Sequence, residues 1–88
     1  MTIEAMLAER GASYGEYADG AKIAMDMFAV AQVAPSYSAM SAAQQYAVFM
    51  ILAKLARMLN GNPNKRDNLW DIIGYATLVL ETLTGDEK

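Results

Sequence analysis

The chain has 88 residues, of which 55% are hydrophobic and 19% are charged, and its formal net charge is −3. It contains no cysteine and no histidine, which excludes disulfide bridges, thiol nucleophiles, imidazole bases and most transition-metal sites. The acidic balance and the absence of any run of lysine and arginine also argue against binding to nucleic acid.

A chain of this length is expected to form one small domain, here residues 1–88. A monomer of this size buries only roughly 60–65% of the surface of its extended chain. Because the share of apolar residues is high, one chain cannot bury all of them. We expect a subunit interface to cover the remaining apolar side chains, in a homodimer or a larger homo-oligomer. The apolar run over residues 46–53 is far shorter than the ~20 residues that span a bilayer. No basic segment typical of a signal peptide opens the chain, so we expect a cytoplasmic protein with no membrane partner.

The first half of the chain predicts two helices and no strand, because its apolar residues recur at helical spacing. Thr2 is suited to cap a short first helix, which Gly11 is expected to end. Gly15 lies in the connector and is expected to adopt a positive φ. A second helix is predicted over residues 16–34, where Pro35 disfavours its continuation.

The second half predicts two longer helices over residues 42–60 and 65–84. Ser41 and Gln44 fit a capping box, in which each side chain accepts a hydrogen bond from the other residue's backbone N–H. The third helix is apolar nearly all round between residues 47 and 53, which is typical of a helix buried on every side. The fold class is therefore all-α, a small bundle of about four helices that oligomerisation completes.

Stop and start signals separate the last two helices. Gly61 is expected to take the left-handed conformation just after the third helix, and Pro63 follows it. Asn64 is a good N-cap for the fourth helix. We expect residues 85–88 to fray.

Charged side chains flank this turn on both sides. Lys54 and Arg57, three residues apart, lie near the end of one apolar helix. Asp67, Asp71 and Tyr75 form a stripe on the next, since residues four apart share a helical face. The short turn makes the two helices neighbours, so that two cations are expected to face two carboxylates in a mostly apolar setting. Buried charges are costly unless they are paired.

Two interpretations of this cluster stay open. In the structural one, Lys54 and Arg57 form salt bridges with Asp67 and Asp71, and Tyr75 packs in the core. In the functional one, the two carboxylates are ligands of a hard cation such as Mg²⁺, and the two cations hold phosphate. Tyr75 would then stack on a base.

The order of the motifs along the chain is more specific than any one motif. These motifs are Glu9-Arg10, Tyr14-Gly15-Glu16, Lys54-Leu55-Ala56-Arg57 and Asp67-Asn68-Leu69-Trp70-Asp71-Ile72-Ile73-Gly74-Tyr75. The pattern resembles a family of small phage and prophage helical proteins of unknown function. Its layout is similar to that of the MazG-like all-α nucleoside triphosphate pyrophosphohydrolases, which are oligomeric helix bundles that use Mg²⁺.

The resemblance implies a role for each polar residue. Asp67 and Asp71 would be the metal carboxylates. Lys54 and Arg57 would hold phosphate, and Tyr75 or Tyr14 would lie near the base. Arg10 belongs to the same ligand-binding set, and the protein would act in the cytoplasm of a bacterial host cell.

The chain departs from the enzyme pattern at the third helix. MazG-like enzymes carry a Glu-x-x-Glu pair there, whereas Gln44 and Gln45 occupy the corresponding stretch and no carboxylate follows them in that helix. We therefore expect a non-catalytic phage or prophage accessory protein, a homo-oligomer whose buried charged cluster binds a phosphorylated ligand or a host protein. The alternative is a Mg²⁺-dependent nucleoside triphosphate pyrophosphohydrolase whose partner is a nucleotide.

Overall fold

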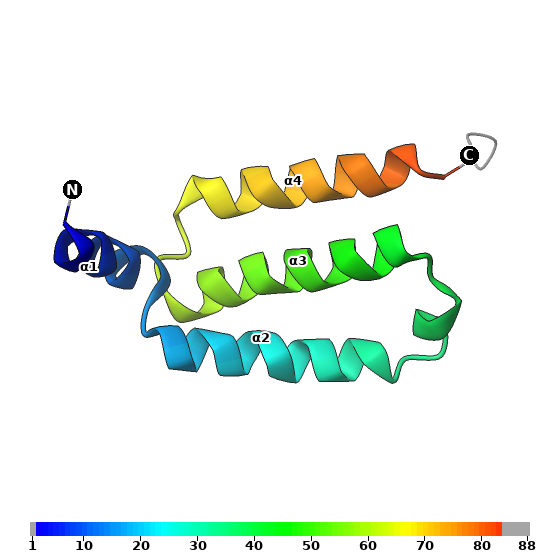
Figure 1. The fold of residues 1–88 in the computed structure, drawn as a ribbon, viewed down its shortest axis with the longest axis horizontal. Helices are drawn as coiled ribbons and strands as arrows, with labels where there is room; N and C mark the ends of the chain where they lie inside the picture. The colour runs from blue at the N-terminus through cyan, green and yellow to red at the C-terminus, as the bar shows by residue number, and fades with distance from the viewer. Residues whose placement is uncertain (1, 84–88) are drawn as a thin grey trace.

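The computed structural model describes residues 2–83, which form four α-helices and one short 3-10 helix (Figure 1). The helices are α1 (Ile3–Tyr14), α2 (Tyr17–Gln32), α3 (Ala42–Asn60) and α4 (Arg66–Glu81), with η1 (Tyr37–Ala39) between α2 and α3. The predicted all-α bundle is confirmed. Within these residues no helix combines the length and apolarity needed to cross a membrane.

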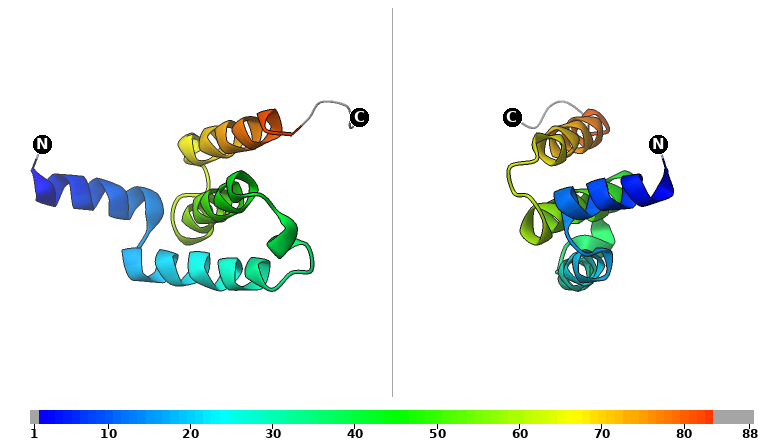
Figure 2. Two further views of the ribbon diagram at one scale, coloured as in Figure 1. Left: turned by 45° about the vertical axis from the view of Figure 1, so that its right-hand side comes forward. Right: turned by 90° about the vertical axis from the view of Figure 1, so that its left-hand side faces the viewer.

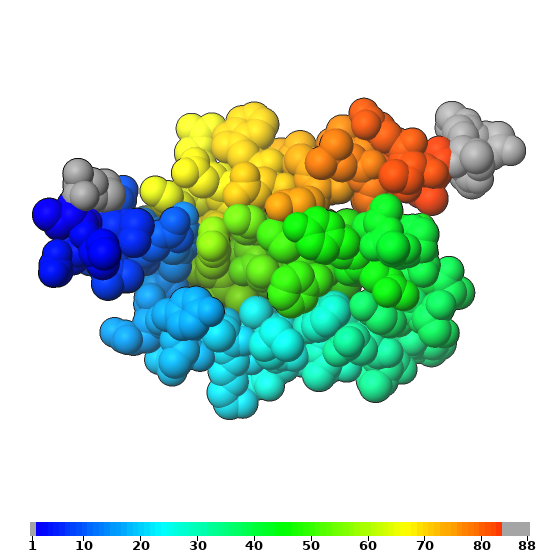
Figure 3. All heavy atoms as spheres, in the orientation of Figure 1, coloured from blue at the N-terminus to red at the C-terminus, as the bar shows by residue number. Residues whose placement is uncertain are grey.

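Three of the helices form a layer. The helix α3 lies in the middle, with α2 along one side and α4 along the other, and α1 projects from the end where α3 and α4 are joined (Figures 1 and 2). The space-filling view shows α2, α3 and α4 packed side by side, with α1 extending beyond them (Figure 3). The molecule is elongated, with extents of 48 × 25 × 21 Å.

The first helix begins as predicted but runs further. The Ala5 N–H donates to Thr2 Oγ1 at 3.0 Å, which confirms the cap. The predicted end at Gly11 is wrong, because α1 continues to Tyr14. A glycine inside a helix costs only about 1 kcal/mol, and nothing near Gly11 forces a break. The helix ends instead at Gly15, whose φ of 78° confirms the predicted positive value.

The third helix has the predicted bounds and the predicted capping box. The Gln44 N–H donates to Ser41 Oγ at 3.1 Å, and the Ser41 N–H donates to Gln44 Oε1 at 2.8 Å. The left-handed conformation predicted for Gly61 is wrong, since its φ is −123°. A glycine is needed there for another reason: a Cβ atom would collide with the backbone of Ser13 and Tyr14, which passes directly over it.

The second and fourth helices differ from the predictions at their ends. The helix α2 ends at Gln32, two residues before the predicted end. Asn64 does not cap α4, whose N-cap is Lys65. The Asn64 N–H instead donates to Asn62 Oδ1 at 2.9 Å, which is an Asx turn. The predicted end of the fourth helix at residue 84 and the predicted fraying of residues 85–88 lie outside the described residues.

The core is small. Ala47 and Ala56 of α3 are buried, and so is Asn68 of α4, whose side-chain amide atoms have no hydrogen-bond partner among residues 2–83. Within residues 47–53 of α3, which were predicted to be buried on every side, Ala47 is buried and the other residues are half-buried, whereas Leu55 and Leu59 beyond this stretch are exposed. The surface area of 6422 Å² exceeds the about 5,100 Å² typical of a compact monomer of this mass. The radius of gyration of 15.1 Å likewise exceeds the expected value of about 12 Å.

Candidate functional site

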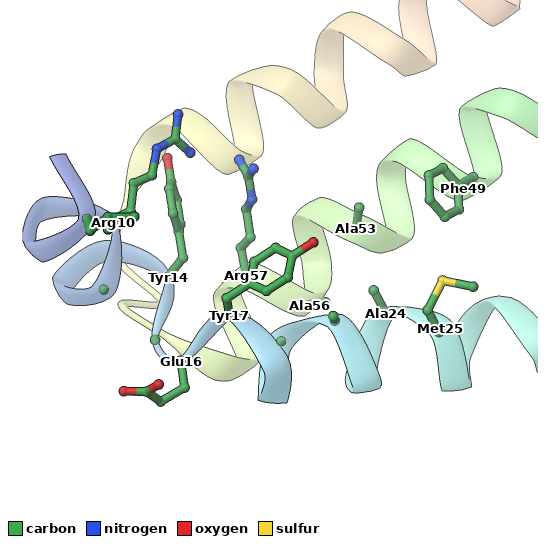
Figure 4. Close-up of a pocket in the computed structure, with 15 residues that line it drawn as sticks. Arg10, Tyr14, Glu16, Tyr17, Ala24, Met25, Phe49, Ala53, Ala56 and Arg57 are labelled. Carbon is green, nitrogen blue, oxygen red and sulfur yellow. The ribbon is translucent and has the colours of Figure 1, made fainter. Parts of the chain in front are cut away.

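An open cleft of about 660 Å³ lies where α1, α2 and α3 meet (Figure 4). Its floor consists of small residues from two helices, Gly20 and Ala24 of α2 and Ala53 and Ala56 of α3. Small side chains at the facing positions leave the space that larger ones would fill. The cleft is thus a consequence of the glycine and alanine content of α2 and α3.

Two arginines and a tyrosine give the cleft its chemistry. Arg10 and Tyr14 come from α1 and Arg57 from α3. The Arg57 guanidinium carbon lies 4.3 Å from the centre of the Tyr14 ring, which is a cation–π contact. In Figure 4 the two guanidinium groups extend toward the same side, whereas the carboxylate of Glu16, which also lines the cleft, points away from them.

The two arginines carry uncompensated charge within the described residues. The salt bridges between residues 2 and 83 are those of Lys22 with Asp26 and of Lys54 with Asp71. The first is exposed, and there the hydrogen bond and the charge of Asp26 raise the pKa of Lys22. Neither pair includes Arg10 or Arg57. Guanidinium groups bind phosphate and carboxylate oxygens through two parallel N–H bonds, so the cleft is suited to an anion.

One side chain holds the α1–α2 turn in place. Asn60 is the last residue of α3, and its Nδ2 donates to the backbone carbonyls of Tyr14 and Glu16, each at 2.9 Å. The Asn62 N–H adds a bond to the Ser13 carbonyl at 2.8 Å. Because Arg57 lies one turn before Asn60 on the same helix, these bonds fix the Tyr14 ring relative to the Arg57 guanidinium.

The structure brings together three of the ligand-binding residues predicted from the sequence and separates the other two. Arg10, Tyr14 and Arg57 line one cleft. Lys54 and Tyr75 lie between α3 and α4, outside it. The Lys54 Nζ binds Asp71 Oδ2 at 2.9 Å, and the Tyr75 ring packs edge-on against a tyrosine of α3 with centroids 6.2 Å apart.

The predicted buried charged cluster is wrong for the described structure. Asp67 is exposed, and the Asp71 side chain is 47% exposed although its partner Lys54 is only 12% exposed. The reason is helical geometry: Lys54 and Arg57 point about 60° apart around α3. Lys54 faces α4, and Arg57 faces the α1–α2 turn. A single salt bridge and a separate cation–π contact take the place of the network.

The predicted magnesium site rests on Asp67 and Asp71 alone. No group of three or more acidic side chains able to hold a metal ion occurs in the described part of the chain. Lys54 already neutralises Asp71, and a divalent cation would compete with it for the same oxygen. A Ca²⁺ site usually requires six to eight oxygen ligands, and a Mg²⁺ site requires an octahedral set of ligands. This donor set fits such an ion poorly, and the magnesium site stays a prediction.

Two further residues of the site are not among those predicted from the sequence. Asn60 precedes Gly61, and the sequence pattern predicts only that it ends a helix. Its two hydrogen bonds join positions 44 and 46 residues away, so no local pattern reveals them. Tyr17 lines the cleft and is 89% exposed, and its closeness to Tyr14 in the sequence was the available signal.

The chain was compared with protein families, curated proteins and solved structures. One family model matches, over residues 2–83, and its description is a domain of unknown function, DUF6378. No curated protein and no solved structure matches the chain. The matched residues include all four helices and every residue of the cleft.

Proposed function

We propose that this chain, which belongs to the family of the domain of unknown function DUF6378, is a non-catalytic accessory protein of phage or prophage origin that binds a small phosphorylated ligand. The order of its motifs supports the phage assignment, and the exposed apolar side chains support the homo-oligomer that we include in the proposal. The observation that carries ligand binding is the placement of Arg10 and Arg57 beside Tyr14 in one cleft.

The cleft suits a phosphate group on chemical grounds. Arg57 is half-buried and oriented by the Tyr14 ring, so that little side-chain entropy is lost when its N–H groups bind oxygen. Arg10 supplies a second positive charge for a phosphate that carries more than one negative charge. The cleft volume lies within the roughly 300–1,000 Å³ typical of small-molecule sites. A ring attached to the phosphate would stack on the Tyr17 side chain at the rim of the cleft.

Calorimetric titration with inorganic pyrophosphate at low ionic strength tests the proposal. We expect saturable binding to the wild-type protein. Arg57→Gln should weaken it by about 10- to 100-fold, the cost of one charge-assisted hydrogen-bonded contact. Arg66→Gln is the matched control, because Arg66 is exposed on α4 and does not line the cleft. Absence of binding to the wild type, or equal losses in the two variants, would refute the phosphate site.

A Mg²⁺-dependent nucleoside triphosphate pyrophosphohydrolase similar to the MazG-like enzymes is the second candidate. The exposed Asp67 and the half-exposed Asp71, one turn apart on α4, favour it. The pairing of Asp71 with Lys54 counts against it. Incubation with a panel of nucleoside triphosphates and Mg²⁺ or Mn²⁺ distinguishes the two functions. Pyrophosphate release that Asp71→Asn abolishes would establish the enzyme and overturn the non-catalytic proposal.

A further inference from the structure

Exposed apolar side chains of α3 and α4 lie on one side of this helix pair. These side chains, which we call the apolar face, are Leu55 and Leu59 of α3 and Leu69, Ile73, Ala76 and Leu80 of α4. Ile73 is 53% and Leu80 65% exposed. The α4 residues are separated by alternating steps of four and three, which is the spacing of a coiled-coil seam. None of the six residues is charged.

The apolar face lies on the side of the layer opposite the cleft. On α3, Leu55 is two residues before Arg57 and points about 200° away from it. Tyr46 is three turns before Arg57, on the same side of α3, and its ring contacts Tyr75 of α4. Ile73 is two residues before Tyr75 and points about 200° away, so it shares the side of Leu55.

The ribbon views agree with this placement. In the end-on view, α1 passes in front of α3 and projects to the right of the stacked α2, α3 and α4, and no described helix projects to the left of the stack (Figure 2, right). The cleft lies on the α1 side because Leu7, Arg10 and Tyr14 line it. Something docked on the apolar face would therefore leave the cleft open.

The chain exposes more surface than one standard dimer interface would cover. Its surface of 6422 Å² exceeds that of a compact monomer of the same mass by about 1,300 Å². A standard interface buries about 800 Å² on each partner. A dimer packed through the apolar face would therefore remove more than half of the surplus surface of each chain, and the projecting α1 exposes part of the rest (Figure 3).

We propose that the apolar face binds a second copy of this chain. The two copies pack face to face in a symmetric dimer, and both clefts open outward. Identical patches oppose each other across a two-fold axis. The six side chains of the apolar face carry no charge, so they pair with their copies without repulsion between like charges. Arg66, the first residue of α4, lines a hollow together with Leu69 and Ile73 and brings one positive charge to that end of the face. This dimer specifies the homo-oligomer that the proposed function includes, and the inference rests on that part of the proposed function.

A pair of matched substitutions on α4 tests the assignment. Leu78 is 61% exposed, about as much as Ile73, but points about 140° away from it around the helix. Light scattering after size-exclusion chromatography measures the mass of each variant. We expect the wild type and Leu78→Glu to have twice the 9.6 kDa mass of the chain, and Ile73→Glu to have the mass of one chain.

The outcomes separate the two proposals. A wild type that stays at 9.6 kDa at high concentration overturns the dimer and the proposed homo-oligomer together, and leaves the apolar face to a different protein, such as a host protein. A dimer that survives Ile73→Glu, or that only Leu78→Glu dissociates, overturns the face alone. Pyrophosphate binding, measured separately, is unaffected by either result.

A second measurement needs no variant and so does not depend on Ile73→Glu folding. Hydrogen exchange of the wild type is followed at high and at low protein concentration. Dilution should remove protection from amides in residues 55–59 of α3 and 69–80 of α4. Concentration-dependent protection confined to α1 and α2 would contradict the assignment.

Discussion

Asn60→Ala is the single substitution from which we expect the largest combined loss of folding stability and of pyrophosphate binding. It removes the side-chain amide that donates to the Tyr14 and Glu16 carbonyls, both at 2.9 Å. The Glu16 carbonyl keeps the bond from the Gly20 N–H at 3.0 Å, as part of the first turn of α2. The Tyr14 carbonyl has no such substitute among the hydrogen bonds of the described residues.

The magnitude follows from these two bonds. Each hydrogen bond contributes about 1 kcal/mol to the free energy of unfolding, so we expect a loss of about 2 kcal/mol. For a domain of this size, that loss lowers Tm by about 8–16 °C. Because the same bonds hold the Tyr14 ring beside Arg57, the variant should also bind pyrophosphate more weakly than the wild type at a temperature where both are folded.

Thermal unfolding followed by circular dichroism measures the first effect, and calorimetric titration measures the second. Asn64→Ala is the control, since Asn64 is exposed and its side chain makes no hydrogen bond within residues 2–83. We expect its Tm to stay close to that of the wild type. Equal melting temperatures for the two variants would refute the role of Asn60 in joining α3 to the α1–α2 turn.

Two further pairs of substitutions are expected to change the free energy of unfolding by different amounts, although the two changes of each pair are chemically similar. Gly15→Ala should lower the free energy of unfolding by more than 1 kcal/mol, because φ is 78° and the new methyl group would collide with Asn60. Gly11→Ala, in the middle of α1 with open space around it, should raise it by about 0.5–1 kcal/mol. In chemical denaturation, a stabilised Gly15→Ala variant or a destabilised Gly11→Ala variant would contradict the corresponding expectation. Asp71→Ala should cost about 1–2 kcal/mol, since it leaves the mostly buried Lys54 unpaired, whereas Lys54→Met should cost less. A larger loss for Lys54→Met would mean that the salt bridge itself, rather than burial of an unpaired charge, sets the energetics.

Features that depend on neighbouring residues could be predicted from the sequence. Ser41 and Gln44 lie three residues apart, and their capping box forms as expected. Gly15 takes a positive φ because it ends a helix at a sharp turn. The bounds of α3 follow from its cap and from the turn residues after it. These three features form as predicted because their signals act within one or two helical turns. The local signal at Gly61 fails, and there the backbone of Ser13 and Tyr14 packs against the glycine.

Features that depend on which sides of two helices meet could not be predicted. The spacing of Lys54 and Arg57 is compatible with one shared cluster, but only Lys54 forms a salt bridge with α4 within the described residues. Arg57 meets Tyr14, 43 residues earlier, because Asn60 and Gly61 bring the α1–α2 turn onto the end of α3. The rotation of each helix about its own axis is a property of the packed bundle. Sequence spacing alone does not determine it.

The most direct test of the phosphate cleft is a nuclear magnetic resonance titration with pyrophosphate, observing the arginine side-chain Nε–Hε signals. We expect saturable shifts for Arg57 and Arg10 with one common dissociation constant. We expect only small, unsaturated changes for Arg66, which is exposed on α4. Shifts of equal size for all three arginines, or none for Arg57, would rule out a phosphate site in the cleft.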